Sequence, residues 1–302
     1  MMSGREVQVT PLWGMLGDSI CGASHLRNNR ANQDAIGWFP ATERANYAVM
    51  SVSDGHGGSG HFRSGTGARL AVEAASETLI EFWNESSESD SYSFIKSSAE
   101  ARLPLVVCRR WQEAVAAHLE RNPLSEKEAA LIPGISKSKP AAGLTRFLPA
   151  YGATLLSVLV TPAYALILQL GDGDILTVTD EGEVQRPLPR DTKLFAEETT
   201  SLGMPEAWKE FRLCFQVLSR HYPALFLLST DGYINCFPSD HDFFQVGRDI
   251  LKMINSRGIE SIRNNLPTWL TEATNLGSGD DATLGIIFRS DLVHRNTRGE
   301  ES

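Results

Sequence analysis

The chain has 302 residues, of which 42% are hydrophobic and 22% charged, and this is enough to bury a substantial core. Its net charge of −9 argues against a nucleic-acid partner, because phosphate backbones bind to basic surfaces. The four cysteines show no C-x-x-C spacing, the N-terminus lacks the apolar stretch of a signal peptide, and no apolar run is long enough to cross a bilayer. We therefore expect a cytoplasmic protein with no membrane contact, no disulfide framework and no zinc site.

Strands are predicted wherever a short apolar run is bounded by turn residues. In chain order these runs cover residues 47–52, 154–160, 164–170, 175–179, 225–228 and 283–288. Turn sequences at residues 160–164 and 171–174 join consecutive strands in the manner of hairpins. Consecutive hairpins favour antiparallel sheets.

Helices are predicted where apolar residues recur every three or four positions. These stretches cover residues 68–83, 105–119, 243–254 and 259–272. Two polar stretches, residues 84–93 and 122–149, are expected to be loops, the second because it holds four prolines. Helices thus come in pairs between blocks of strands, which indicates an α+β fold with sheets inside and helices outside.

Aspartates recur at the ends of the predicted core strands. The strongest motif, Asp54-Gly55-His56-Gly57-Gly58, follows the strand at residues 47–52. Its glycines allow a sharp turn and the close approach of an ion or a phosphate, although an ordinary turn also uses these residue types. Similar aspartates occur at three other places, namely Asp172, Asp231 and the pair Asp280-Asp281.

If these strand ends meet at one edge, their carboxylates lie close together. Two such charges about 4 Å apart repel each other by about 4 kcal/mol at an effective dielectric constant of 20. Either the pKa values of the carboxyl groups rise or cations neutralise them. Because oxygen ligands select hard ions, Mg²⁺ and Mn²⁺ are the expected cations.

Six short segments resemble, in order, the motifs of the metal-dependent protein phosphatases, the type 2C serine/threonine family. They are Gln33-Asp34-Ala35, Asp54 to Gly58, Gly152-Ala153-Thr154, Gly171-Asp172, Ser229 to Gly232 and Asp280 to Thr283. The resemblance extends over about residues 18–290 and favours a bacterial-type member. It implies a four-layer α/β/β/α sandwich, in which two central antiparallel sheets are flanked by helices. It also implies a single phosphatase domain over residues 1–302, with residues 122–149 as a loop insertion.

The resemblance further implies an enzyme that hydrolyses phosphoserine and phosphothreonine on proteins. The reaction would use a water activated by two divalent cations, Mn²⁺ or Mg²⁺. In such a site Asp54 bridges the two cations, and the carbonyl of Gly55 binds one of them. Asp231 and Asp280 complete the ligands of the pair.

Three other roles follow from the same resemblance. Asp34 would orient the attacking water. Asp172, together with Asp231, would help to bind a weaker third cation. His56 would be the general acid that protonates the leaving oxygen of serine or threonine.

Two departures from the family pattern concern the ions and the substrate. Many members have a glutamate where this chain has Gln33, so one formal charge is missing and a lower affinity for the ions is expected. The arginine that grips the substrate phosphate in the family falls at Asn29 in this chain. Arg27 and Arg30 lie on either side, and each is either a substitute for that arginine or a surface residue.

An alternative interpretation is a catalytically weak relative that acts as a phosphoprotein-binding or interaction module. Gln33 and the displaced arginine favour this alternative, whereas the intact Asp54 and His56 favour an enzyme. In both cases the expected partner is a phosphorylated protein and the expected state is a monomer. His25 and His61 have no recognisable partner pattern and are expected to be structural or exposed.

Overall fold

The computed structural model describes residues 11–294 apart from residues 43, 88, 90, 133–142, 191–199 and 219–221. The strands of this part of the chain form two sheets, and all neighbouring strands are antiparallel. Across the first sheet the order is β1 (Trp13–Ile20), β10 (Ala282–Arg289), β9 (Leu225–Ser229), β6 (Asp174–Val178) and β7 (Val184–Gln185). Across the second sheet it is β2 (Ala35–Phe39), β3 (Ala48–Ser53), β4 (Leu155–Val160), β5 (Tyr164–Leu170) and β8 (Arg212–Val217).

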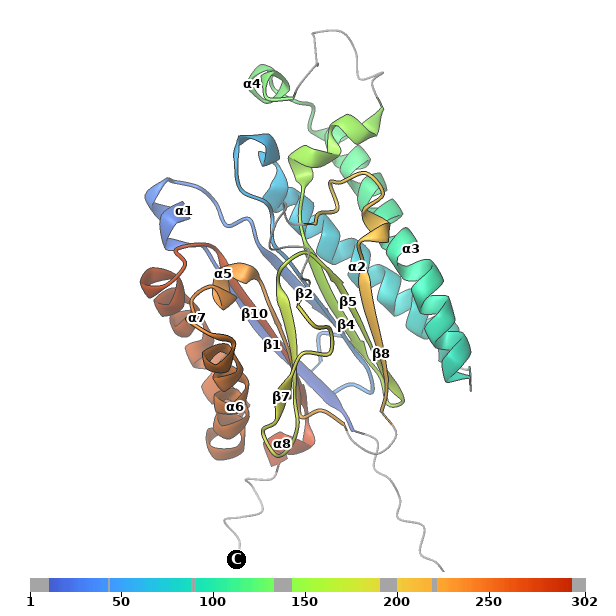
Figure 1. The fold of residues 1–302 in the computed structure, drawn as a ribbon, viewed down its shortest axis with the longest axis vertical. Coiled ribbons are helices and arrows are strands. Elements are labelled where there is room, and N and C mark those ends of the chain that lie inside the picture. The colour runs from blue at the N-terminus through green and yellow to red at the C-terminus, as the bar shows by residue number, and fades with distance from the viewer. Residues whose placement is uncertain are drawn as a thin grey trace, which may run out of the picture.

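Long helices cover the outer face of each sheet, which gives four layers (Figure 1). The first sheet is covered by α6 (Asp240–Arg257) and α7 (Ile259–Leu276), and the second by α2 (Ser64–Ser86) and α3 (Tyr92–Arg121). The shorter helices are α1 (Ala23–Arg27), α4 (Glu126–Ala130), α5 (Asp231–Ile234) and α8 (Asp291–His294). The expected sandwich of two antiparallel sheets between helices is confirmed. None of the described helices combines the length and apolar character needed to cross a membrane.

The strands read as continuous apolar runs because both faces of each sheet are covered. Between the sheets, Met50 and Val158 of the second sheet pack with Phe226 and Ile287 of the first. On the outer side of the second sheet, Leu159 packs in the cluster that α2 and α3 complete. With one face against the other sheet and one against helices, neither face of a strand has to be polar.

Four strands were not predicted, namely β1, β2, β7 and β8. In β1, a Cβ at Gly17 would lie 2.9 Å from the backbone oxygen of Leu284 in β10, so the pairing of the strands favours a glycine, which interrupts the apolar run. Residues in β8 are partly exposed along its length, so the strand carries no strong apolar signal. Tertiary contacts therefore define these strands more than their local sequence does.

The segment 171–174 is not the hairpin turn that the sequence suggested. Strand β5 lies in the second sheet and β6 in the first, so the segment carries the chain from one sheet to the other. Gly171 has a φ of 102°, in the region that favours glycine. Asp174 belongs to β6 rather than to a turn, and its carboxylate is paired with Arg186. The crossing places Asp172 close enough to Asp231 for its charge to raise the pKa of that residue.

The predicted loop at residues 84–93 is much shorter in the structure. Helix α2 continues to Ser86 and α3 begins at Tyr92. The side chain of Ser91 caps α3 by accepting a hydrogen bond from the backbone nitrogen of Phe94 at 3.4 Å. Several polar residues of the stretch 84–93, such as Asn84 and Ser93, lie at the exposed ends of these two helices. Composition alone does not distinguish such helix ends from a loop.

The stretch 122–149 is also not wholly a loop, although its residues 133–142 lie outside the described part of the chain. It contains α4, which starts with a reciprocal capping box between Ser125 and Glu128. The guanidinium of Arg63, at the start of α2, contacts the Glu128 carboxylate at 2.7 Å. This ion pair ties the segment to the end of the molecule at which α2 begins.

Candidate functional site

Carboxyl groups from three other segments gather around Asp54, which directly follows β3. Asp34 precedes β2, Asp172 links β5 to β6, and Asp231 begins α5. Burial raises the pKa of Asp54 well above its ordinary value, and the negative charges of Asp34 and Asp231 raise it further. The charge of Asp172 acts in the same direction. Four of the aspartates selected from the sequence therefore share one site.

The backbone around Asp54 is fixed by neighbouring segments. The Thr154 hydroxyl accepts a hydrogen bond from the Asp54 nitrogen at 3.0 Å, and the Thr154 nitrogen donates to the Asp54 carbonyl at 2.8 Å. The next residue, Gly55, donates its N–H to the Gln33 carbonyl at 3.2 Å. A Cβ at Gly55 would lie 2.6 Å from that carbonyl oxygen, so the close approach requires a glycine. The Gly-Ala-Thr segment and the Gln33 turn thus hold Asp54 from two sides.

Asp34 has one satisfied and one unsatisfied carboxylate oxygen. Its Oδ2 accepts hydrogen bonds from the hydroxyls of Thr283 at 2.7 Å and Thr230 at 2.8 Å. Its Oδ1 is buried and has no hydrogen-bond partner among the described residues. Burial raises the pKa of Asp34 to about 7 against the two threonine hydrogen bonds, and the charges of Asp281 and Asp231 contribute to the rise. A buried oxygen of this kind calls for a proton, a water or a cation.

Asp231 and Asp280 extend the cluster toward the start of β10. Burial raises the pKa of Asp231, a hydrogen bond with Asp54 opposes this, and the charges of Asp172 and Asp280 add to the rise. The side chain of Asn235 donates to Asp231 at 3.0 Å, and the Asp280 side chain is half exposed, with 54% of its surface accessible. Asp280 therefore lies on the solvent side of the cluster, close enough to influence Asp231.

The donor set fits hard divalent cations. Besides burial, the influences that raise the pKa of Asp54 all come from carboxyl groups. Several buried carboxylates with mutual repulsion, and one orphaned oxygen on Asp34, form an oxygen-only site. Mg²⁺, Mn²⁺ and Ca²⁺ prefer such ligands, and they would remove the repulsion that raises the pKa values.

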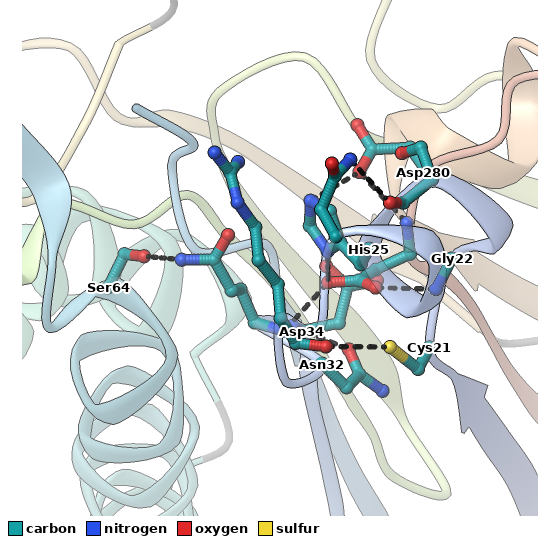
Figure 2. A network of polar contacts seen from close by, with 12 residues as sticks. Cys21, Gly22, His25, Asn32, Asp34, Ser64 and Asp280 are labelled. Atoms are coloured by element: carbon teal, nitrogen blue, oxygen red, sulfur yellow. Dashed lines mark hydrogen bonds and ion pairs between the residues drawn. The ribbon is translucent and has the colours of Figure 1, made fainter. Parts of the chain in front are cut away.

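Gln33 does not direct its amide at the aspartates. Its side-chain nitrogen donates to the hydroxyl of Ser64 at 2.5 Å, the contact drawn as a dashed line at Ser64 in Figure 2. Its backbone nitrogen donates to Asp281 Oδ2 at 2.7 Å. Gln33 thus connects the turn before β2 to the first residue of α2, and Ser64 is a partner that no local motif in the sequence indicated.

The two candidate phosphate-binding arginines are both exposed. A terminal nitrogen of Arg27 lies 4.0 Å from the position of a Cβ at Gly279, so this guanidinium is near the loop that carries Asp280. Arg30 is anchored through its backbone, with its nitrogen donating to the carbonyl of His25 at 2.9 Å. Between them, Asn29 adopts a φ of 52°, which asparagine tolerates better than most residues. The turn after α1 thus gives Asn29 a conformational role at the position where the family has its arginine.

His56 is packed against a second histidine. Its ring centroid lies 5.3 Å from that of His61 in an edge-to-face arrangement. The Nδ1 of His61 lies 2.6 Å from the carbonyl oxygen of Pro149, and the backbone nitrogen of His56 donates to the carbonyl of Gly152 at 3.1 Å. This contact suits the structural role expected of His61, and the sequence could not indicate it because Pro149 is 88 positions away.

His25 also has partners that the sequence did not indicate. Its Nε2 lies 3.6 Å from Asp280, and its Nδ1 lies 2.9 Å from the buried Asp281 (Figure 2). Helix α1 follows β1, and β1 pairs along its whole length with β10, whose first residues follow this acidic pair. The pairing of the two strands therefore brings His25 to residues about 255 positions away.

A cleft of about 190 Å³ opens beside the aspartates. Asp172, Asp231 and Asn235 line one part of it, and Arg190 and Arg212 line another. Acidic and basic groups thus face the same small space. This arrangement suits a ligand that carries both a cation and a phosphate group.

Comparison with known proteins agrees with this geometry. A family model described as protein phosphatase 2C matches residues 21–271. No curated protein matches the chain in sequence.

Solved structures with the same fold include several phosphatases. The serine/threonine phosphatase Stp1 from Staphylococcus aureus has a TM-score of 0.55 at 14% identity, covering 95% of this chain and 99% of that one. The Mycobacterium tuberculosis serine/threonine phosphatase PstP/Ppp has a TM-score of 0.51 at 18% identity, covering 92% and 99%. A C. elegans sex determining protein has a TM-score of 0.58 at 17% identity, covering 93% and 66%. The family match spans most of the chain, and the chain belongs to the protein phosphatase 2C family.

Proposed function

We propose that this protein is a serine/threonine protein phosphatase whose Asp54 cluster holds two divalent cations, Mn²⁺ or Mg²⁺. The observation that carries the proposal is the group of mutually repelling aspartates around Asp54, whose pKa values burial and neighbouring charges raise together. Family membership supports phosphatase chemistry with metals. The catalytic domain of the M. tuberculosis phosphatase PstP was solved in complex with two manganese ions, and this chain shares its fold at 18% identity.

Asp54 would lie between the two cations, and the Gly55 carbonyl would be a ligand of one. Asp231 and Asp280 would complete the pair, while Asp172 and Asp231 would hold a weaker third cation. When bound, the cations would lower the pKa of a water and neutralise the phosphoryl oxygens.

The remaining roles belong to side chains of the chain itself. Asp34, held at Oδ2 by Thr230 and Thr283, would use its free Oδ1 to orient the attacking water. His56, against the ring of His61, would donate a proton to the leaving serine or threonine oxygen. Arg27 or Arg30 would pair with the substrate phosphate from the solvent side.

A second candidate is a catalytically weak relative that binds phosphoproteins. Two observations favour it: the Gln33 amide bonds to Ser64 rather than to the cluster, and Asn29 occupies the position of the family arginine. Under this alternative the aspartate cluster would still take cations, but bound phosphopeptide would not be turned over.

We further propose that residues 1–302 form one phosphatase domain, with residues 122–149 as an insertion, and that the protein is a cytoplasmic monomer acting in signalling. Its partners would be phosphorylated proteins rather than nucleic acids or membranes. The chain has 37 acidic and 28 basic residues, and this negative balance argues against nucleic acids as partners.

A phosphothreonine peptide distinguishes the two candidates. Purified full-length protein should release phosphate from the peptide when Mn²⁺ or Mg²⁺ is added, and the Asp54→Asn variant should not. Saturable binding of the peptide without release of phosphate, in the presence of either ion, would establish the binding module instead.

A further inference from the structure

Beside the aspartate cluster, three side chains of different chemistry meet at one point. The thiol of Cys21, the imidazole of His25 and a carboxylate oxygen of Asp281 all lie within 4.8 Å of one another. Cys21 follows β1, His25 is in α1, and Asp281 precedes β10. Figure 2 shows Cys21 and His25 on the same side of the network, next to Asp280 and Gly22.

Asp281 is fixed at this point by the backbone around it. Its Oδ1 accepts a hydrogen bond from the nitrogen of Gly22 at 2.6 Å, and its Oδ2 accepts one from the nitrogen of Gln33 at 2.7 Å. Only 3% of the side chain is exposed. An ionised carboxylate has about four lone-pair sites, so Asp281 retains acceptor capacity that these two bonds do not use.

A buried nitrogen of His25 faces this carboxylate. Its Nδ1 lies 2.9 Å from Asp281 Oδ2, within ion-pair distance, but it makes no hydrogen bond to any of the described residues. A buried imidazole nitrogen in this state is uncommon and calls for an explanation. A cation between the nitrogen, the carboxylate and the thiol would supply one.

The other ring nitrogen completes a pattern typical of metal-bound histidines. The Nε2 of His25 faces Asp280 Oδ1 at 3.6 Å. A histidine that binds a metal through one nitrogen usually directs the N–H of the other toward a carboxylate, which fixes the tautomer and the orientation of the ring. His25 has such a carboxylate on the far side of its ring.

We propose that Cys21 Sγ, His25 Nδ1 and Asp281 Oδ2 form a site for a borderline-soft divalent cation of the zinc class, separate from the oxygen-only cluster around Asp54. A thiolate and an imidazole select zinc over magnesium or manganese. Tetrahedral zinc, with bonds of about 2.0 to 2.3 Å, places its ligand atoms about 3.5 Å apart. The three groups lie within 4.8 Å of one another, and His25 Nδ1 and Asp281 Oδ2 are 2.9 Å apart, so zinc requires only small shifts of these side chains. A water would be the fourth ligand.

A cation that binds at this site replaces the proton of the Cys21 thiol. Burial, followed by the charge of Asp281, raises the pKa of the Cys21 thiol, and without a cation its S–H reaches the carbonyl oxygen of Arg30 at 3.5 Å. The incoming cation displaces this proton to solvent. No local motif indicates the site, because Asp281 is 260 residues from Cys21 in the chain.

Cobalt absorption tests the site independently of any phosphatase activity. Co²⁺ replaces zinc in such sites, and a thiolate ligand gives it a charge-transfer band in the near ultraviolet that oxygen ligands do not produce. Reduced full-length protein, with excess Mg²⁺ to fill the aspartate cluster, should develop this band up to one equivalent of Co²⁺. One equivalent of Zn²⁺ should then remove it.

Three variants make the assignment specific. Cys21→Ser should abolish the band and lower the affinity for Zn²⁺ by more than the 10- to 100-fold typical of losing a group that only orients a ligand. His25→Gln should lower the Zn²⁺ affinity while the thermal unfolding of the metal-free protein stays unchanged. Cys236→Ser, at another partly buried cysteine, should leave the band intact. Absence of the band in the wild-type protein, or its persistence in Cys21→Ser, would overturn the proposal.

Discussion

Asp54 and Thr154 hold each other's backbone, although 100 residues separate them in the chain. The Asp54 nitrogen donates to the threonine hydroxyl, and the Thr154 nitrogen donates to the Asp54 carbonyl. The second sheet thereby fixes the position of the aspartate on which the proposed metal centre depends. Thr154 is itself buried, so its hydroxyl serves this contact rather than solvent.

Thr154→Val tests this relationship. The substitution keeps the shape of the side chain but removes the hydroxyl, so the partly buried N–H of Asp54 loses its acceptor. We expect a loss of about 1 to 3 kcal/mol in the free energy of unfolding, measured by urea denaturation. Affinity for Mn²⁺ should also fall, because Asp54 is no longer held. Unchanged stability together with unchanged Mn²⁺ affinity would show that Asp54 is positioned by other contacts.

Asp54→Asn should affect stability and activity in opposite directions. In metal-free protein the substitution removes one of several repelling carboxylates, so the urea midpoint should rise in the presence of a chelator. Phosphatase activity should be lost, because the shared ligand of the proposed cations is gone. Asp249→Asn, at an exposed aspartate of α6, should change neither quantity. A lower midpoint for Asp54→Asn would mean that its carboxylate is stabilised in the metal-free fold.

The stability of the metal-free protein should decrease as the pH rises from about 4 to about 7. Asp34 has an ordinary pKa of 3.8 and a pKa of about 7 in the fold, so over this range the folded protein holds a proton that the unfolded chain has lost. This pKa difference corresponds to about 4 kcal/mol in the free energy of unfolding. The contribution is present at low pH and is lost as the pH rises through 7. Urea midpoints in a chelator at several pH values would measure it.

The contribution of Asp34 is the difference between the wild-type protein and Asp34→Asn, which has no carboxyl group to titrate at this position. The fall of the urea midpoint with rising pH should be less steep in the variant. Mn²⁺ should also make it less steep in the wild-type protein, by replacing the proton. Identical slopes for the two proteins would show that Asp34 ionises normally in the fold.

His56→Ala should impair the reaction according to the leaving group. Serine and threonine alkoxides leave poorly without a proton, whereas p-nitrophenolate leaves readily. A positioned general acid contributes roughly 10²- to 10⁴-fold in rate, so kcat on a phosphoserine peptide should fall by about that factor. Hydrolysis of p-nitrophenyl phosphate should fall much less. Steady-state kinetics on the two substrates measures the ratio.

His241→Ala is the control, because this histidine is exposed, with 83% of its side-chain surface accessible. It should change neither rate. Equal losses on the two substrates for His56→Ala, accompanied by weaker Mn²⁺ binding, would assign His56 a role in shaping the glycine-rich turn instead of in proton transfer.

The parts of the fold that the sequence predicted are those where local pattern and tertiary environment agree. Buried strands such as β5 and amphipathic helices such as α6 carry their signal in consecutive residues. Strand β1 does not, because Gly17, which the close backbone of β10 favours, interrupts its apolar run. The segment 171–174 has the composition of a hairpin turn, and only the distribution of β5 and β6 between the two sheets shows that it is a crossing.

The same distinction applies to the candidate site. Asp54, Asp172, Asp231 and Asp280 could be selected because each stands at an end of an apolar strand next to a glycine or a second acid. Asp34 follows only from the family resemblance. Other residues of the site could not be selected in this way, because their partners are remote in sequence. Ser64 contacts Gln33, His25 contacts Asp281, and His61 contacts Pro149. Asn29 shows a further limit, since its left-handed backbone conformation cannot be read from a motif in which arginine is expected.

The most direct test of the proposed metal centre counts the Mn²⁺ ions that turnover requires. Chelated full-length protein would be titrated with Mn²⁺ by calorimetry while phosphate release from a phosphothreonine peptide is followed at each addition. We expect two ions per chain, activity that appears only as both sites fill, and both fewer bound ions and no turnover in Asp54→Asn. Full activity after exhaustive chelation, or Mn²⁺ binding that Asp54→Asn leaves unchanged, would contradict the account.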